Sequence, residues 1–194
     1  MIGISAIDYV TKAVSCDEGR YNMTGAYREY DKLIATDGHR LHIVSGLVNQ
    51  EKGGFIDGRD AQFPCYEQVL PKKAEAIGTV TFTKKEIAHL NKVVKLFRDR
   101  NCGCRFEFKR GEALKITAHD KGEKDSFEIV LTFPNVEIDR DHTIGLNLRY
   151  FVEALIPNLP MTFSSEGDKG PQVLETVQYD GKYMAVVMPL KLDF

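Results

Sequence analysis

A short Asp-Gly segment constrains the fold of this chain more than any other feature. Asp37-Gly38 stands between an apolar stretch, Leu33-Ile34, and an alternating one that runs from Leu41 to Ile43. An Asp-Gly pair flanked in this way is a strong short-range signal for a β-hairpin, because glycine tolerates the positive φ that a tight turn needs. Taken alone, residues 35–41 fit an ordinary hairpin tip and a binding loop equally well.

A plan of strand, polar cap and amphipathic helix recurs three times along the chain. The expected helices cover residues 5–15, 84–98 and 148–156, with Thr83 and Asn147 as N-caps of the second and third. Strand-like segments follow the helices, at residues 105–108, 114–117, 127–133 and 184–190. Residues 49–62 are polar and glycine-rich, which is typical of a loop or linker. The pattern predicts an α+β fold built of βαβββ units with antiparallel sheets.

Composition excludes several classes of protein. The net charge is −2 and 43% of the residues are hydrophobic, so the chain can bury a core but does not coat nucleic acid by charge alone. No apolar run reaches the roughly 18 residues of a membrane span, and the first residues do not resemble a signal peptide. We therefore expect a cytoplasmic protein without membrane contact. Its four cysteines have no second ligand pair at zinc-site spacing, so we expect free thiols and no metal.

Two further segments carry a family resemblance. Residues 63–71 read Phe-Pro-Cys-Tyr-Glu-Gln-Val-Leu-Pro, and residues 183–192 read Tyr-Met-Ala-Val-Val-Met-Pro-Leu-Lys-Leu. Together with the Asp-Gly hairpin, and in this order, they resemble the signature segments of the bacterial DNA polymerase III β subunit, the sliding clamp. The stretches 114–118 and 144–147 are also similar to that family. The resemblance implies a DNA-clamp fold.

The same resemblance implies a domain organisation. Residues 1–48 resemble the first half of the family's middle domain, residues 62–73 its connection to the last domain, and residues 79–194 the last domain itself. We therefore expect a partial clamp domain at 1–73 and a complete one at 74–194. The family's first domain and the second half of its middle domain have no counterpart, so three of six βαβββ halves are present.

In the family, replication proteins insert a short, partly hydrophobic peptide between the middle and last domains. The resemblance carries this client-peptide site over to Met23, Thr36, Gly38, His39, Arg40, Leu41, Pro64, Val69, Val186, Met188, Pro189 and Leu190. The thioethers and aliphatic groups suit a site that accepts several peptides, and Arg40 and His39 are expected to pair with polar atoms of the peptide at the rim. The alternative is that these are core side chains, with Arg40 merely on the surface.

The second expected helix is basic along one side. Lys84, Lys85, Lys92 and Lys95 fall on one arc at 100° per residue, opposite an apolar stripe. The resemblance implies that such a helix faces the DNA backbone without reading sequence, and mobile lysines suit that role. The alternative is a solvated charged face. Arg20 and Tyr21 match a family loop that approaches double-stranded DNA, and Leu96 and Phe97 match a position of subunit contact.

No catalytic arrangement is present in the sequence. It has no phosphate-binding glycine loop, no His-x-x-x-His pair and no Gly-x-Ser-x-Gly elbow, so we expect neither an enzyme nor a cofactor. The leading hypothesis is a sliding clamp that assembles a homo-oligomeric ring and tethers DNA polymerase and other replication proteins to DNA. The rival is a clamp-like adaptor or decoy that binds the same peptides without encircling DNA.

Overall fold

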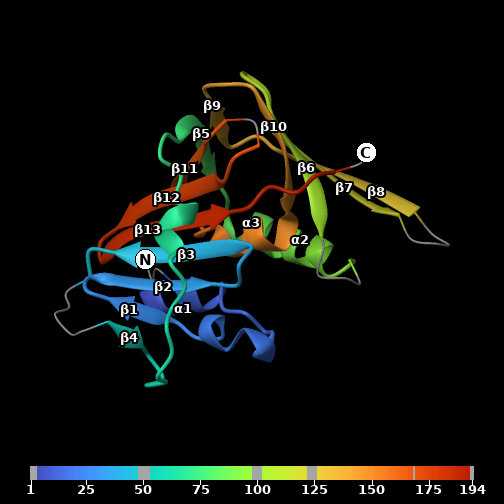
Figure 1. Cartoon of the computed structure of the whole chain (residues 1–194). Coiled ribbons are helices and arrows are strands. Elements are labelled where there is room, and N and C mark those ends of the chain that lie inside the picture. The colour runs from blue at the N-terminus through green and yellow to red at the C-terminus, as the bar shows by residue number, and fades with distance from the viewer. Residues whose placement is uncertain (1–3, 48–52, 98–101, 122–125, 168, 193–194) are drawn as a thin grey trace.

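The computed structural model describes residues 4–47, 53–97, 102–121, 126–167 and 169–192. Figure 1 shows two sheets standing at an angle to each other, with the helices gathered on one side of them. The helices are α1 (Ala6–Thr11), α2 (Lys84–Val94) and α3 (Leu148–Ala154), and two 3-10 helices are η1 (Glu18–Met23) and η2 (Tyr66–Val69). Within the described residues no helix has the length and apolar character needed to cross a membrane.

Every strand pairs antiparallel with its neighbours. The strands are β1 (Tyr27–Glu29), β2 (Lys32–Thr36), β3 (Arg40–Ser45), β4 (Gly54–Phe55), β5 (Glu75–Thr81), β6 (Gly103–Phe108), β7 (Leu114–Lys121), β8 (Ser126–Phe133), β9 (Val136–Ile138), β10 (His142–Asn147), β11 (Pro160–Ser165), β12 (Gln172–Gln178) and β13 (Gly181–Val187). Among these residues one sheet has nine strands in the order β4-β1-β2-β3-β13-β12-β11-β5-β9, and the other has four in the order β10-β6-β7-β8.

Two interlocked βαβββ units form the larger part of the fold. One runs β5–α2–β6–β7–β8 and the other β10–α3–β11–β12–β13. Each unit lends its first strand to the sheet of the other, because β5 pairs with β11 and β10 pairs with β6. The segment α1–β1–β2–β3 has the helix and the three following strands of a βαβββ unit. It extends the nine-stranded sheet through the β3–β13 pairing. The predicted α+β fold of βαβββ units is confirmed.

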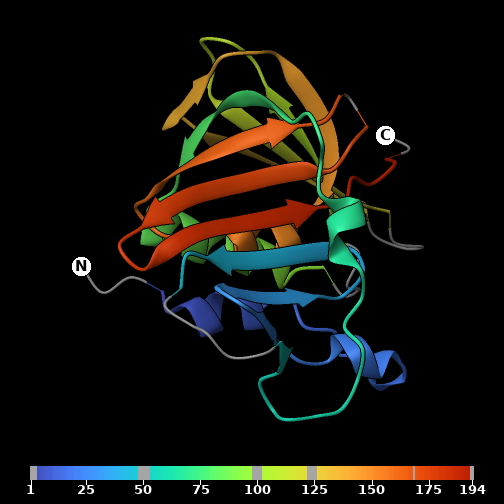
Figure 2. The same ribbon diagram turned by 60° about the vertical axis from the view of Figure 1, so that its left-hand side comes forward.

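Side-chain caps fix where the helices begin. Thr83 and Glu86 form a capping box on α2: the Glu86 amide donates to the Thr83 hydroxyl at 3.2 Å, and the Thr83 amide donates to the Glu86 carboxylate at 2.7 Å. Asn147 caps α3 by accepting from the amides of Arg149 and Tyr150. The three helices lie on one face of the nine-stranded sheet, behind it in Figure 2. They form a row, since α3 contacts α2 and bonds to α1 through Tyr9.

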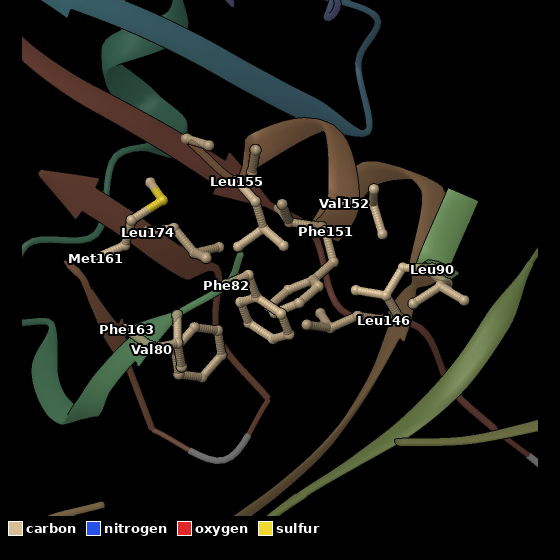
Figure 3. Close-up of a cluster of buried hydrophobic side chains, with 14 of the residues drawn as sticks. Val80, Phe82, Leu90, Leu146, Phe151, Val152, Leu155, Met161, Phe163 and Leu174 are labelled. Atoms are coloured by element: carbon tan, nitrogen blue, oxygen red, sulfur yellow. The ribbon is translucent and has the colours of Figure 1, made fainter. Parts of the chain in front are cut away.

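The nine-stranded sheet carries a cluster of buried side chains on each face. Alternate residues of a strand point to opposite faces, so Tyr183 and Ala185 of β13 join the core under the helices while Val186 joins a second cluster on the other face. Figure 3 shows the core under the helices, where the rings of Phe82 and Phe151 point toward one another. Their centroids lie 5.9 Å apart in an edge-to-face arrangement.

Element ends differ from the sequence-based expectations. The helix expected at 5–15 ends at Thr11. The helices expected to reach residues 98 and 156 end at Val94 and Ala154, and Arg98 lies outside the described residues. The strand expected at 184–190 ends at Val187, two residues before Pro189, whose ring nitrogen has no hydrogen to donate.

The expected linker at 49–62 contains the short strand β4, which pairs with β1, whereas residues 49–52 lie outside the described part of the chain. One core cluster includes Val10 and Leu33 from one side of residue 73 and Leu174 and Tyr183 from the other. Side chains from both expected domains thus share one core. The division at residue 73 stays a prediction.

Candidate functional site

The tip of the β2–β3 hairpin, residues 36–40, is held by its own side chains. Asp37 Oδ1 accepts from the amides of His39 and Arg40 at 2.9 and 3.1 Å, and Thr36 Oγ1 donates to the Arg40 carbonyl at 2.6 Å. Gly38 has φ +88°, a conformation that favours glycine. A Cβ at this position would also lie 2.9 Å from Nη1 of Arg20. The hairpin predicted from the Asp-Gly signal is confirmed, since β2 and β3 pair on either side of it.

The segment that follows β4 lies on the face of the sheet away from the helices. Phe63 stacks on Tyr27 with ring centroids 4.9 Å apart, and the Tyr66 hydroxyl donates to Glu29 at 2.5 Å. These contacts anchor η2 beside the ends of β3 and β13, where Figure 2 shows it at the edge of the sheet. Val69, the last residue of η2, is left 41% exposed.

An apolar cavity of about 170 Å³ opens between the hairpin tip, η2 and the end of β13. Its walls contain nine of the twelve residues that the sequence assigned to a client-peptide site: Met23, Thr36, Gly38, Arg40, Leu41, Pro64, Val69, Val186 and Met188. Cys65 and Tyr66 complete it. We call it the apolar cavity. Four separate segments of the sequence thus contribute to the apolar cavity.

A second, larger cavity of about 690 Å³ adjoins the first, because Arg40 and Met188 line both. It contains the three remaining predicted residues, His39, Pro189 and Leu190. Many ionisable side chains line it, so we call it the charged cavity. The Met188 amide donates to the His39 carbonyl at 3.0 Å and fixes the C-terminal segment against the hairpin tip. We call the two adjoining cavities together the cleft.

Arg40 differs from its predicted role. The sequence placed its guanidinium at the rim, but the side chain is 7% exposed and forms ion pairs with Asp37, at 3.1 Å, and with Glu153. It also donates to the Lys12 carbonyl and lies over the Tyr150 ring, 4.4 Å from the centroid. Burial lowers the pKa of Arg40, while the Asp37 carboxylate opposes that shift. Arg40 is therefore an internal brace and a wall of the cleft.

Sequence reasoning missed the helix residues that line the charged cavity. Lys12 comes from the end of α1, and Arg149, Tyr150 and Glu153 come from α3, which packs beside it. The pattern identified both helices, and Asn147 as a cap, but no signal in the sequence placed them beside the hairpin tip. Among the described residues no group of His, Cys, Asp and Glu could hold a metal ion.

Comparison with known proteins gives a consistent structural result. No protein-family model matches the chain, and no curated protein matches its sequence. Among solved structures, the DNA polymerase III β subunit of Pseudomonas aeruginosa aligns over 98% of this chain and 66% of its own length, with a TM-score of 0.73 and 20% identity. The β subunits of Borrelia burgdorferi (TM-score 0.72, 18% identity) and Thermotoga maritima (0.70, 17%) also align over 98% of this chain, and over 62% and 65% of their own lengths.

The chain has the sliding-clamp fold. It spans somewhat less than two thirds of the length of the clamps that it matches. A structure of the Pseudomonas aeruginosa clamp bound to griselimycin aligns with a TM-score of 0.72. The fold predicted from three signature segments is thus the one observed. The sequence identity is too low for the function to be inferred from structural similarity alone.

The residues that the sequence assigned to DNA binding lie in two separate parts of the structure. Lys84, Lys85, Lys92 and Lys95 are all exposed on or just after α2, as the helical pattern predicted. Arg20, expected on a DNA-facing loop, donates to the Asp37 carbonyl at 2.7 Å and lines the charged cavity. The same loop carries Tyr21, which is 55% exposed and contacts the guanidinium of Arg59.

The two residues predicted for self-association differ in how far they are exposed to solvent. Leu96 is 56% exposed just beyond α2, whereas Phe97 is 8% exposed and belongs to the core under the helices. The ring of Phe97 is therefore largely covered by its own chain. Leu96 is the more accessible of the two, and the self-association of this position stays a prediction.

Proposed function

We propose that this protein is a non-enzymatic, cytoplasmic clamp-like factor whose cleft binds a short, partly apolar peptide of DNA polymerase and other replication proteins. The observation that carries the proposal is the apolar cavity, in which nine of twelve residues assigned from the sequence meet. Its volume is below the roughly 300–1,000 Å³ of sites for drug-sized ligands, so it suits one or two apolar side chains.

The walls of the apolar cavity suit exchangeable binding. Met23 and Met188 supply flexible, polarizable thioethers that adapt to different apolar groups. Burying one apolar anchor is worth about 1.5–3 kcal/mol, from which the cost of ordering the peptide is subtracted. The expected affinity is modest, as a protein that exchanges one client for another requires.

A second part of the proposal is that the helix face lies toward double-stranded DNA. The four exposed lysines of α2 support it, and a groove between the three helices is lined by Lys12 and Lys84 as well. Lysines contact phosphates in many registers, so such a face can slide without reading sequence. We propose that copies of this chain assemble into a ring that keeps this face toward the duplex.

An adaptor that never encircles DNA is the alternative candidate. It is favoured by β4, a strand of two residues that covers the outer edge of β1, where another subunit would otherwise be able to pair. It is also favoured by the burial of Phe97, which leaves one of two predicted contact residues largely covered. Both candidates use the same peptide cleft.

Calorimetric titration with a consensus clamp-binding peptide tests the cleft. We expect a micromolar dissociation constant, raised about tenfold by Met188→Ala, which corresponds to about 1.4 kcal/mol. Val130→Ala, at a 49% exposed position on β8 outside the cleft, is the matched control and is expected to leave the affinity unchanged. No heat at high micromolar peptide, or equal affinity in the Met188 variant, removes the proposal.

The ring is tested separately. Light scattering measures the mass in solution, and retention on nicked circular DNA, lost when the circle is cut, identifies a topological link. A ring predicts an oligomer and this selective retention. Monomers at tens of micromolar, without retention, favour the adaptor.

A further inference from the structure

Positive charge exceeds negative charge in the charged cavity. Its lining includes the four cations Lys12, Arg20, Arg40 and Arg149, against the three carboxylates Asp17, Asp37 and Glu153. All three carboxylates are already engaged: Asp17 lies 3.6 Å from Arg20, and Asp37 and Glu153 both pair with Arg40. Arg149 therefore faces the cavity without a carboxylate partner among the described residues, and the carboxylate that acts on Lys12, that of Asp8, is not part of the cavity lining.

The surroundings of Arg149 show how incompletely it is satisfied. Its Nε–H is buried and has no hydrogen-bond acceptor among the residues that the structure describes. A buried donor without an acceptor costs about 1–3 kcal/mol, so the rest of the chain satisfies the Arg149 guanidinium only in part. Lys12 is partly satisfied, because its ammonium group donates to the Glu153 carbonyl at 3.2 Å. That contact supplies a dipole but no negative charge.

The cations also lie near enough to repel one another. Burial lowers the pKa of Lys12 and the neighbouring Arg40 lowers it further, while the Asp8 carboxylate opposes the shift. Burial likewise lowers the pKa of Arg40, and Arg149 adds to that shift. Each shift means that positive charge at the group is disfavoured by its surroundings. An anion between these groups would relieve the repulsion.

We propose that the charged cavity is a carboxylate-binding subsite in which Arg149 and Lys12 hold an acidic group of the bound peptide. The inference rests on the proposed peptide-binding function, because it places the carboxylate on the same ligand. The subsite adjoins the apolar cavity, since Arg40 and Met188 line both, so one short peptide is long enough to occupy the two. The planar guanidinium of Arg149 can hold a carboxylate with two parallel hydrogen bonds.

Either an Asp or Glu side chain or the C-terminal carboxylate of the peptide fits this chemistry. Three peptides with the same apolar anchors distinguish them: one with an acidic side chain and an amidated C-terminus, one with Asn or Gln in its place, and one with that amide side chain and a free C-terminus. Fluorescence anisotropy measures each affinity with the wild-type protein, Arg149→Gln and Arg105→Gln. Arg105 is exposed on β6 outside the cavity and serves as the matched control.

The wild-type protein and the Arg105 variant are expected to bind at least one carboxylate peptide about tenfold more tightly than the fully amidated one. In Arg149→Gln, the ratio of the affinity for that carboxylate peptide to the affinity for the fully amidated one is expected to fall to about one. The affinity for the fully amidated peptide itself is expected to stay unchanged. Equal binding of all three peptides by the wild-type protein, or a preference that survives in Arg149→Gln, overturns the carboxylate subsite and leaves the peptide cleft intact. Absence of binding by every peptide removes the cleft itself, and the subsite with it.

Discussion

Arg40 and Glu153 form an ion pair that joins the N-terminal hairpin to helix α3. The two residues are 113 positions apart in the sequence, and Arg40 is 7% exposed at the junction of the two cavities. The arginine side chain is thus one of the structural elements that hold the cleft in shape. Breaking one partner of such a pair is costly because the other remains buried with its charge uncompensated.

We expect Glu153→Gln to lower the free energy of unfolding by about 2 kcal/mol, because Arg40 loses one of two carboxylates while staying buried. Urea denaturation measures the change, with Glu112→Gln at an exposed position as control. Adding Arg40→Met to Glu153→Gln should cost less than the sum of the two single changes, since each single change already breaks the same Arg40–Glu153 ion pair. Equal stability of Glu153→Gln and the wild-type protein contradicts the bracing role.

Gly38→Ala tests the hairpin tip. Gly38 has φ +88°, so an alanine there is strained by about 1–2 kcal/mol, and its Cβ would lie 2.9 Å from Arg20 at the cleft. Gly111→Ala has a similar φ of +75° but open space around it, and we expect a comparable loss of stability with unchanged peptide binding. Gly54→Ala meets nothing within 4 Å and should be neutral. Peptide affinity that falls equally in the Gly38 and Gly111 variants would show that the tip has no special part in the cleft.

His42 makes stability depend on pH. Its ring stacks on Tyr9 with centroids 4.7 Å apart, its Nδ1 donates to the Tyr9 carbonyl at 2.9 Å, and burial lowers its pKa from 6.5 to about 3. The unfolded chain takes up this proton first, so the free energy of unfolding falls as the pH drops from about 6.5 toward 3, by about 1.4 kcal/mol per pH unit.

In His42→Phe the stacking surface remains but the titrating group is gone. We expect the loss of stability between pH 7 and pH 5 to be smaller by about 2 kcal/mol than in the wild-type protein. Urea denaturation at the two pH values measures the difference. An identical loss in both proteins would mean that other groups account for the acid sensitivity.

The lysines of α2 are expected to set the salt dependence of DNA binding. Changing Lys84, Lys85, Lys92 and Lys95 to Gln should flatten the plot of the logarithm of the DNA association constant against the logarithm of the salt concentration. Each lost phosphate contact is expected to make the slope less negative by about 0.9. Anisotropy of a labelled 30-base-pair duplex at several salt concentrations measures that slope. A matched variant with Lys72, Lys73, Lys109 and Lys191 changed to Gln keeps the same net charge and should retain the wild-type slope. Equal slopes in the two variants contradict a DNA-facing α2.

The fold was predictable because its signals are local. Asp37-Gly38 defined a hairpin, and Thr83 and Asn147 defined helix starts, through contacts within a few residues. Most of the apolar cavity followed from the resemblance of three segments. The exposed lysines of α2 followed from the 3.6-residue period alone.

Features that depend on distant contacts were not predictable. Nothing near Arg40 in the sequence indicates that Glu153 would draw it inside, so its place at the rim was predicted wrongly. Lys12 and Arg149 reach the charged cavity only because α1 and α3 pack side by side. Phe97 follows Leu96 directly, and one is buried while the other is exposed because the chain turns at the end of α2.

The methionine methyl groups offer the most direct test of the peptide cleft. Met23 and Met188 line the apolar cavity from opposite ends of the chain, whereas Met161 is 1% exposed in the core under the helices. In a ¹³C-methyl NMR titration with a clamp-binding peptide, we predict that the signals of Met23 and Met188 shift together and saturate at one affinity, while that of Met161 stays in place. A bound peptide that leaves both cavity methyl signals unmoved, or a titration without any change, contradicts the account.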